Sequence, residues 1–252
     1  MFVYPKEPKD RIIVALDVST ADEAKELIDQ LAPHVGMFKV GLELFVSTGP
    51  AIVQVIRAAH SECFLDLKFH DIPTTVGRAS AKAAALGVSM FNVHASNNIE
   101  AMEAAVKNKG GSLVLAVTVL TSFSDDNTRE IYNAPTQEKV LQLALLAERA
   151  GVDGIICAPT DLEFLRMPWE TNRLLFVTPG VRPAWAQSND QKRVTTPMEA
   201  TLAGSDHLVI GRPITNPPSE IGSSVEAAKR IAQEIEEALA VIRERGGGRT
   251  AW

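Results

Sequence analysis

RIIVALDVSTADEAKELIDQL, residues 11–31, joins a short apolar run to a segment with helical spacing. The run over 11–17 is rich in β-branched residues and does not alternate with polar ones, which is typical of a strand covered on both faces. Ser19 or Thr20 can cap the segment that follows, and Glu23 is placed for a capping box. The stretch therefore predicts a buried strand, a turn and a helix.

The same alternation of strand-like and helix-like segments continues along the chain without a break in composition. Eight strand-then-helix units predict one α/β domain over residues 1–245, a single (β/α)8 TIM barrel. A doubly wound open sheet is the structural alternative, but it needs no eighth unit and usually has a glycine-rich first turn, whereas the first turn here is LDVST. Residues 246–252 are predicted to be a disordered tail without function. The seven further strand runs are 37–41, 63–68, 90–95, 113–119, 154–158, 174–179 and 207–211.

Composition and charge exclude several classes of protein. The 252 residues are 46% hydrophobic with a net charge of −6, so a generally basic surface for nucleic acid is absent. No apolar run reaches membrane-spanning length, and the N-terminal residues do not resemble a signal peptide. Cys63 and Cys157 lie far apart in strand runs, which favours two reduced thiols over a disulfide or a metal pair. We therefore expect a cytoplasmic protein that binds neither nucleic acid nor membrane.

The segment DLKFHDIPTT, residues 66–75, carries the strongest chemical signal. Asp66 and Lys68 are two apart in a strand and so project from the same face, and Asp71 follows where the strand gives way to a loop. Lys39 ends the neighbouring strand, so an alternating Lys–Asp–Lys–Asp array is expected around one point at the carboxyl end of the barrel. Two carboxylates beside Lys68 favour its charged form, an ammonium proton donor. The alternative is a purely structural ion-pair network.

A candidate phosphate site lies at the other end of the sequence. TPGVRP (178–183) leaves the seventh strand and IGRPIT (210–215) leaves the eighth, and many barrels bind phosphate with the loops after these strands. Gly211 lets the backbone approach a ligand, and Arg212 offers a bidentate fork. A phosphate site opposite the charged array favours a functional over a structural reading of that array.

A long connection begins at Arg182. VRPAWAQSNDQKRVTTP, residues 181–197, is longer than a minimal strand-to-helix connection and suits a lid that closes on a ligand, with Gln191 adding a contact. A solvated surface loop is the alternative.

These segments together resemble the orotidine 5′-phosphate decarboxylase family, from about Arg11 to the last helix. DLKFHDIPTT is the most specific of them. The other matching segments are ALD (15–17), FKVG (38–41), NVHA (92–95), LTS (120–122), TPGVRP (178–183), DQKR (190–193) and IGRPIT (210–215). One departure is that many relatives carry Gly-Gly after NVHAS, where this chain has Asn97 and Asn98; because asparagine tolerates left-handed backbone, we expect the turn to survive.

The resemblance implies a role for each matching residue. Lys68 would donate the proton, within a network of Lys39, Asp66 and Asp71. Asp71 and Thr75 would reach across a homodimer interface, so that each active site is shared between two subunits. The residues implied to bind the nucleotide are Asp17, Lys39, Asp66, Thr75, Thr121, Ser122, Arg182, Gln191, Gly211 and Arg212.

The implied reaction is the decarboxylation of orotidine 5′-monophosphate to uridine 5′-monophosphate without a cofactor. No pyridoxal phosphate, thiamine or metal-ligand motif is apparent, and the five histidines form no compact ligand set, so no metal is predicted. We expect His94 to serve packing and hydrogen bonding.

Two other functions remain open at this point. The first is a magnesium-dependent sugar-phosphate decarboxylase or aldolase of the same suprafamily, which shares the Asp-x-Lys-x-x-Asp pattern. The second is a non-catalytic barrel that binds a phosphorylated metabolite. The long decapeptide argues against the first, and the presence of all four charged residues argues against the second.

Overall fold

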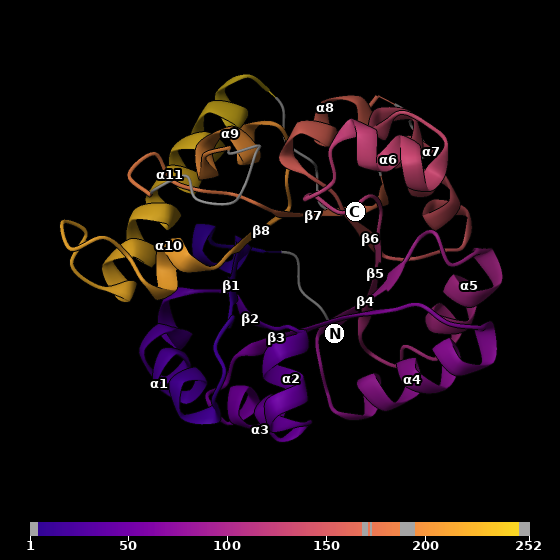
Figure 1. Ribbon diagram of the computed structural model, residues 1–252. Helices are drawn as coiled ribbons and strands as arrows, with labels where there is room; N and C mark the ends of the chain where they lie inside the picture. The colour runs from indigo at the N-terminus through magenta and orange to yellow at the C-terminus, as the bar shows by residue number, and fades with distance from the viewer. Residues whose placement is uncertain (1–4, 168–170, 172, 187–194, 247–252) are drawn as a thin grey trace.

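Eight parallel strands close into a barrel in sequence order, which confirms the predicted TIM barrel (Figure 1). The computed structural model describes residues 5–167, 171, 173–186 and 195–246. Strand β1 pairs with both β2 and β8, and this pairing completes the ring. The strands are β1 (Ile12–Ala15), β2 (Met37–Val40), β3 (Glu62–Phe69), β4 (Met90–His94), β5 (Leu113–Val117), β6 (Gly154–Ile156), β7 (Leu175–Pro179) and β8 (His207–Ile210).

Helices follow the strands and surround the barrel (Figure 1). The first helix begins as predicted, with Thr20 rather than Ser19 as its cap: the Glu23 amide donates to Thr20 Oγ1, and the Thr20 amide donates to the Glu23 carboxylate. The α-helices are α1 (Ala21–Leu31), α2 (Leu42–Thr48), α3 (Ala51–Ala58), α4 (Pro73–Ala85), α5 (Ile99–Lys107), α6 (Asp125–Tyr132), α7 (Thr136–Arg149), α8 (Leu162–Leu165), α9 (Pro197–Leu202), α10 (Arg212–Thr215) and α11 (Ser224–Glu244). The 3-10 helices are η1 (Pro8–Arg11), η2 (Ala32–His34) and η3 (Pro159–Asp161).

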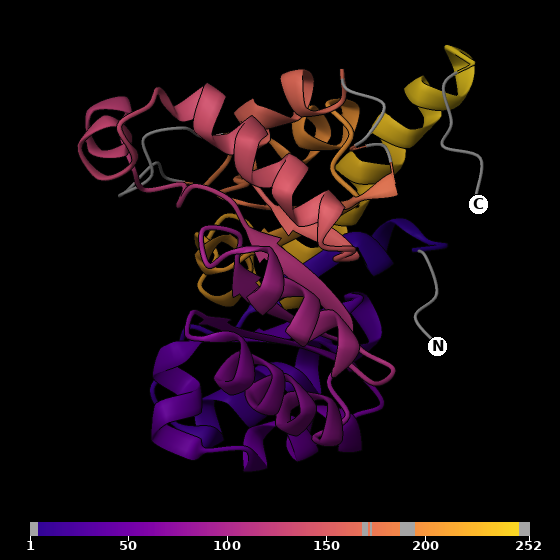
Figure 2. The same cartoon turned by 90° about the vertical axis from the view of Figure 1, so that its right-hand side faces the viewer.

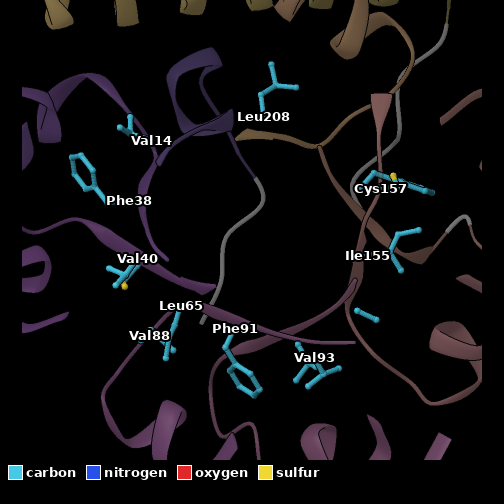
Figure 3. Close-up of a cluster of buried hydrophobic side chains, with 14 of the residues drawn as sticks. Val14, Phe38, Val40, Leu65, Val88, Phe91, Val93, Ile155, Cys157 and Leu208 are labelled. Carbon is cyan, nitrogen blue, oxygen red and sulfur yellow. The ribbon is translucent and has the colours of Figure 1, made fainter. Parts of the chain in front are cut away.

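The core has two layers, one on each side of the strands. Phe38, Phe91 and Ile155 belong to the outer layer, and Figure 3 shows them projecting away from the barrel centre. Phe64 and Met90 belong to a separate cluster that fills the barrel interior. Because strand residues are buried on both faces, the strand runs are continuously apolar rather than alternating.

The polar chemistry lies at one end of the barrel. Since η1 directly precedes β1, the strands begin at the end where η1 lies, toward the right in Figure 2, and the last turns of α11 lie toward the same side. The carboxyl ends of all eight strands therefore meet at the opposite end, where barrel enzymes have their active sites.

Both cysteines are buried and free, in agreement with the expected reduced thiols. Burial raises the pKa of the Cys63 thiol to about 12, which makes it a poor nucleophile. No helix in the described part of the chain combines the length and apolar character that crossing a membrane requires. Residues 247–252 of the predicted tail lie outside the described residues.

Candidate active site

Three of the four predicted array residues form one ion-pair network at the carboxyl end of the barrel. Lys39 Nζ on β2 lies 3.4 Å from Asp66 Oδ2 on β3. Lys68 Nζ, also on β3, lies 2.6 Å from Asp66 Oδ1. Asp66 therefore bridges two lysines, one to each carboxylate oxygen. Asp17, two residues beyond β1, extends the network with its Oδ1 at 3.2 Å from Lys39 Nζ.

Burial and charge act in opposite directions on Asp66. Burial by itself raises the pKa of this carboxyl, but Lys39, Lys68 and a hydrogen bond from Asn92 outweigh it, and the net pKa is lowered. Asp66 is therefore an anion at neutral pH, held at the end of an apolar barrel by two cations. A buried carboxylate of this kind is tolerated only because its charge is compensated.

The backbone of Lys68 is unusual for a strand. Its φ is +52°, and among the described non-glycine residues with positive φ it is the only one inside a strand. The pairing of β3 with β4 shifts register here, since Leu65 pairs with Phe91 but Phe69 pairs with Val93. Left-handed backbone costs a residue other than glycine about 1–2 kcal/mol. Strain of this kind is often found at functional sites.

Asn92 on β4 supports this geometry, and the sequence analysis assigned it no role. Its side-chain oxygen accepts the Lys68 backbone N–H at 2.7 Å, and its Nδ2 donates to Asp66 Oδ1 at 2.7 Å. A signal for it was present, because Asn92 is a polar residue inside the apolar run MFNVH and shares a face with His94. A buried polar side chain in a strand needs a partner.

Asp71 does not join the other three charges within the chain. It is exposed on the connection from β3 to α4, and its Oδ1 accepts the Ile72 N–H at 2.7 Å. No ion pair between Asp71 and a lysine occurs among the described residues. Thr75 is likewise exposed, in the first turn of α4. The expected four-charge array is therefore a three-charge array in the single chain, since the loop after Lys68 directs Asp71 outward.

The two predicted phosphate arginines line a common cavity of about 250 Å³. Arg182 is buried after β7, and Arg212 is the first residue of α10, after β8. The other lining residues are Ala186, Pro213, Asn216, Pro217 and Pro218. A Cβ atom on Gly211 would lie 3.4 Å from Asp17 Oδ2, so this cavity adjoins the ion-pair network.

A larger cavity, of about 540 Å³, lies at the other end of the barrel. Its lining includes Met37, Glu62 and His207, each the first residue of its strand. It is remote from the lysine–aspartate network, so size alone does not identify the chemical site of this molecule.

Two further predicted binding residues follow a strand at the same end of the barrel as the lysine–aspartate network. Thr121 and Ser122 are exposed beyond β5, before α6. Gln191 and the segment DQKR lie outside the described residues, and the lid expected there stays a prediction.

Two histidines stand beside the network. The rings of His70 and His94 are 5.2 Å apart. Burial, followed by the charges of His70 and Lys68, lowers the pKa of His94, which favours its neutral form. Among the described residues, no group of three or more histidine, cysteine or acidic side chains is arranged to hold a metal ion.

The turn after NVHAS, where this chain has Asn97 and Asn98, still leads into a helix. Asn98 has a φ of +134° and caps α5 by accepting the Ala101 N–H at 2.9 Å. Asparagine therefore replaces glycine here without loss of the helix start.

Comparisons with known proteins agree with this geometry. The family model described as "Orotidine 5'-phosphate decarboxylase / HUMPS family" matches residues 10–231. A protein of Geotalea uraniireducens named orotidine 5'-phosphate decarboxylase is 48% identical over 237 residues, 91% of this chain and 96% of that one. A protein of the same name from Heliobacterium modesticaldum is 45% identical over 245 residues, 93% of this chain and 99% of that one.

A solved structure gives the same result. The crystal structure of orotidine 5'-phosphate decarboxylase from Lactobacillus acidophilus superposes with a TM-score of 0.77 at 35% identity, covering 89% of this chain and 98% of that one. The match covers nearly the whole barrel, so the chain belongs to the orotidine 5′-phosphate decarboxylase / HUMPS family.

Proposed function

We propose that this protein decarboxylates orotidine 5′-monophosphate to uridine 5′-monophosphate, a step of pyrimidine biosynthesis. The observation that carries the proposal is the network in which Asp66 bridges Lys39 and Lys68, 3.4 and 2.6 Å away, beside a cavity lined by two arginines. The curated relatives at 43–48% identity bear the name of this enzyme.

Lys68 acts as the proton donor in this proposal. The bond between C6 of the pyrimidine and the carboxyl carbon breaks, CO2 leaves, and the electron pair stays on C6. No π-system spreads this charge, so an ammonium group fixed beside C6 must stabilise it as it develops. Lys68 Nζ then gives a proton to C6 and regains one from solvent. A preorganised cation does both tasks without a cofactor or a metal ion.

The rest of the nucleotide supplies binding energy away from the reacting carbon. In the proposal Arg182, Arg212 and the Gly211 backbone hold the phosphate, together with Gln191. Asp17 and Lys39 bind the ribose hydroxyls, and Thr121 and Ser122 contact the pyrimidine. Binding energy from these remote groups orders the site around C6.

We further propose a cytoplasmic homodimer with shared active sites. The connection from β3 to α4 places Asp71 and Thr75 in solvent, next to Ile72, which is 66% exposed. An exposed apolar side chain between two exposed polar residues of the same connection fits a surface that a second copy covers. Asp71 and Thr75 would then complete the partner's site.

The experiment is an absorbance assay of orotidine 5′-monophosphate consumption by purified protein after exhaustive chelation with EDTA, with chromatographic detection of uridine 5′-monophosphate. The proposal predicts full turnover, since Lys68 is the electrophile. Neither turnover nor binding of the nucleotide, with or without Mg²⁺, would favour the sugar-phosphate alternative. Binding of the nucleotide without turnover would favour the non-catalytic alternative.

A further inference from the structure

Asn92 is a buried amide in the interior of the barrel. Its side chain is on the face of β4 that also carries Met90 of the interior cluster, and the residue is 1% exposed. Burying an unpaired amide is costly, so Asn92 is tolerated there because its side chain makes two hydrogen bonds. Both go to β3: one to the Lys68 backbone N–H and one to Asp66 Oδ1, each at 2.7 Å.

The chemistry of these two partners leaves one orientation for the amide. A backbone N–H only donates, and an ionised carboxylate only accepts. The Asn92 oxygen must therefore face Lys68 and its NH2 group must face Asp66. An aspartate here would place a second carboxylate against Asp66, and a leucine would leave both partners without the bond.

The two bonds converge on the group that is proposed to move the proton. Asp66 Oδ1 accepts from Asn92 Nδ2 at 2.7 Å and from Lys68 Nζ at 2.6 Å. The other bond holds the amide of Lys68, whose φ of +52° departs from strand geometry at the register shift between β3 and β4. Asn92 thus restrains both the backbone from which the lysine projects and the oxygen to which its ammonium group is bonded.

We propose that Asn92 is a positioning residue for the decarboxylation, which fixes Lys68 Nζ relative to the pyrimidine C6. The inference rests on the proposed function, because it needs Lys68 to be the proton donor. Its role differs from nucleotide binding, so its removal should affect turnover rather than affinity. A misplacement of about 1 Å at a reacting group lowers turnover by about 100-fold.

The first test is Asn92→Leu, which keeps the side chain's approximate size and removes both bonds. We expect kcat on orotidine 5′-monophosphate to fall by about 100-fold, with the Kd of uridine 5′-monophosphate unchanged within about threefold. Ser112→Ala is the matched control. Ser112 is also buried and also bonds a backbone group, the Val88 carbonyl at 2.6 Å, but it precedes β5 at the opposite end of the barrel. This control should lose stability and keep its kcat.

A second variant keeps the test open if Asn92→Leu does not fold. Asn92→Asp still accepts the Lys68 N–H, but its carboxylate repels Asp66 until it is protonated, and the neighbouring carboxylate raises its pKa. Once protonated, the introduced carboxyl donates to Asp66 as the amide does. The kcat of this variant relative to wild type should therefore rise as the pH falls from about 8 to about 6.

The outcomes separate the inference from the function on which it rests. Wild-type protein that does not decarboxylate the nucleotide would overturn the proposed function. If the wild-type protein is active, two results for Asn92→Leu would overturn the positioning role and leave the function intact. One is a kcat within threefold of wild type, and the other is a fall of kcat and product affinity by the same factor. A ratio of Asn92→Asp to wild-type kcat that does not change with pH would also overturn it.

Discussion

At the scale of single residues, the site depends on charges that compensate each other. Asp66 is buried and ionised because Lys39 and Lys68 each approach one of its oxygens. Removing one member leaves the others with an uncompensated charge, which is costly away from water. Substitutions within the network therefore disturb charge and geometry together, whereas the phosphate arginines can be tested one at a time.

Arg212→Ala is predicted to weaken nucleotide binding without disturbing the fold. Arg212 is exposed and shares the 250 Å³ cavity with Arg182. A hydrogen bond to a charged group is worth about 1.5–3 kcal/mol, so the Michaelis constant should rise by about 10- to 150-fold. Steady-state kinetics measure this change. Arg243→Ala, on the exposed face of α11, is the matched control and should have no effect.

The phosphate itself provides the decisive comparison for Arg212. On orotidine, which has no phosphate, the variant and the wild-type protein should be equally slow. An equal loss on both substrates, or an unchanged Michaelis constant on the nucleotide, would remove Arg212 from the phosphate site.

Sequence alone predicted the charged residues of the network, but it did not predict the residue that hydrogen-bonds to them and holds them in place. Asp66 and Lys68 were identifiable because charged side chains inside apolar strands are costly unless they are paired or functional. The role of Asn92 depends on a register shift between two strands, which no local pattern reveals. Asp71 was expected beside Lys68 from its spacing, but the direction of the loop decides its place.

At the scale of elements, the strands were predictable, and three of the α-helices, α2, α6 and the four-residue α10, were not. Strands buried on both faces appear as continuous apolar runs, and all eight expected runs contain a strand. Helix α2 was missed because it is short and exposes Leu42 and Val46, which obscures any apolar face. Helix α6 was missed because DDNTREIY buries only Thr128, so its hydrophobic periodicity is weak.

The first turn of α5 permits a test of backbone strain. Asn98 has φ +134° and ψ 169°, a region that is essentially restricted to glycine and costs other residues about 1–3 kcal/mol. Glycine is nearly as good as asparagine at a helix N-cap, with a loss of only about a few tenths of a kcal/mol. Asn98→Gly should therefore raise the free energy of unfolding by about 1 kcal/mol.

Chemical denaturation of Asn98→Gly and Asn98→Ala distinguishes strain from capping. The alanine variant keeps the strain and loses the bond to the Ala101 N–H, so it should be less stable than wild type by about 1 kcal/mol. A glycine variant that is clearly less stable than wild type would show that the cap outweighs the strain.

At the scale of the whole molecule, the single chain presents an incomplete version of the proposed site. Asp71 and Thr75 lie in solvent on the connection after β3, while Lys68 is held within the strand. If a second copy covers this surface, each site takes Lys68 from one subunit and Asp71 from the other. Lys68→Ala and Asp71→Ala homodimers should then both be nearly inactive.

Mixed dimers of these two variants are predicted to regain activity. The Asp71→Ala subunit contributes an intact Lys68 and borrows the partner's Asp71, while the other site carries both lesions. Random reassortment makes about half of the dimers mixed, so about a quarter of wild-type activity should return. Co-refolding followed by mass spectrometry and assay measures this. Mixed dimers that form but remain inactive would place both residues in one subunit's site.

The central claim is that Lys68 stabilises the developing carbanion and protonates it. The most direct measurement compares orotidine 5′-monophosphate turnover by the wild-type protein, Lys68→Ala and Lys109→Ala. Lys109 is the matched control, a half-buried lysine paired with Asp153 at 2.6 Å, where β5 and β6 begin, remote from the site. The account predicts that Lys68→Ala loses at least about 1,000-fold in kcat while Lys109→Ala keeps wild-type turnover. A Lys68→Ala protein that still forms uridine 5′-monophosphate within about tenfold of the wild-type rate would contradict it.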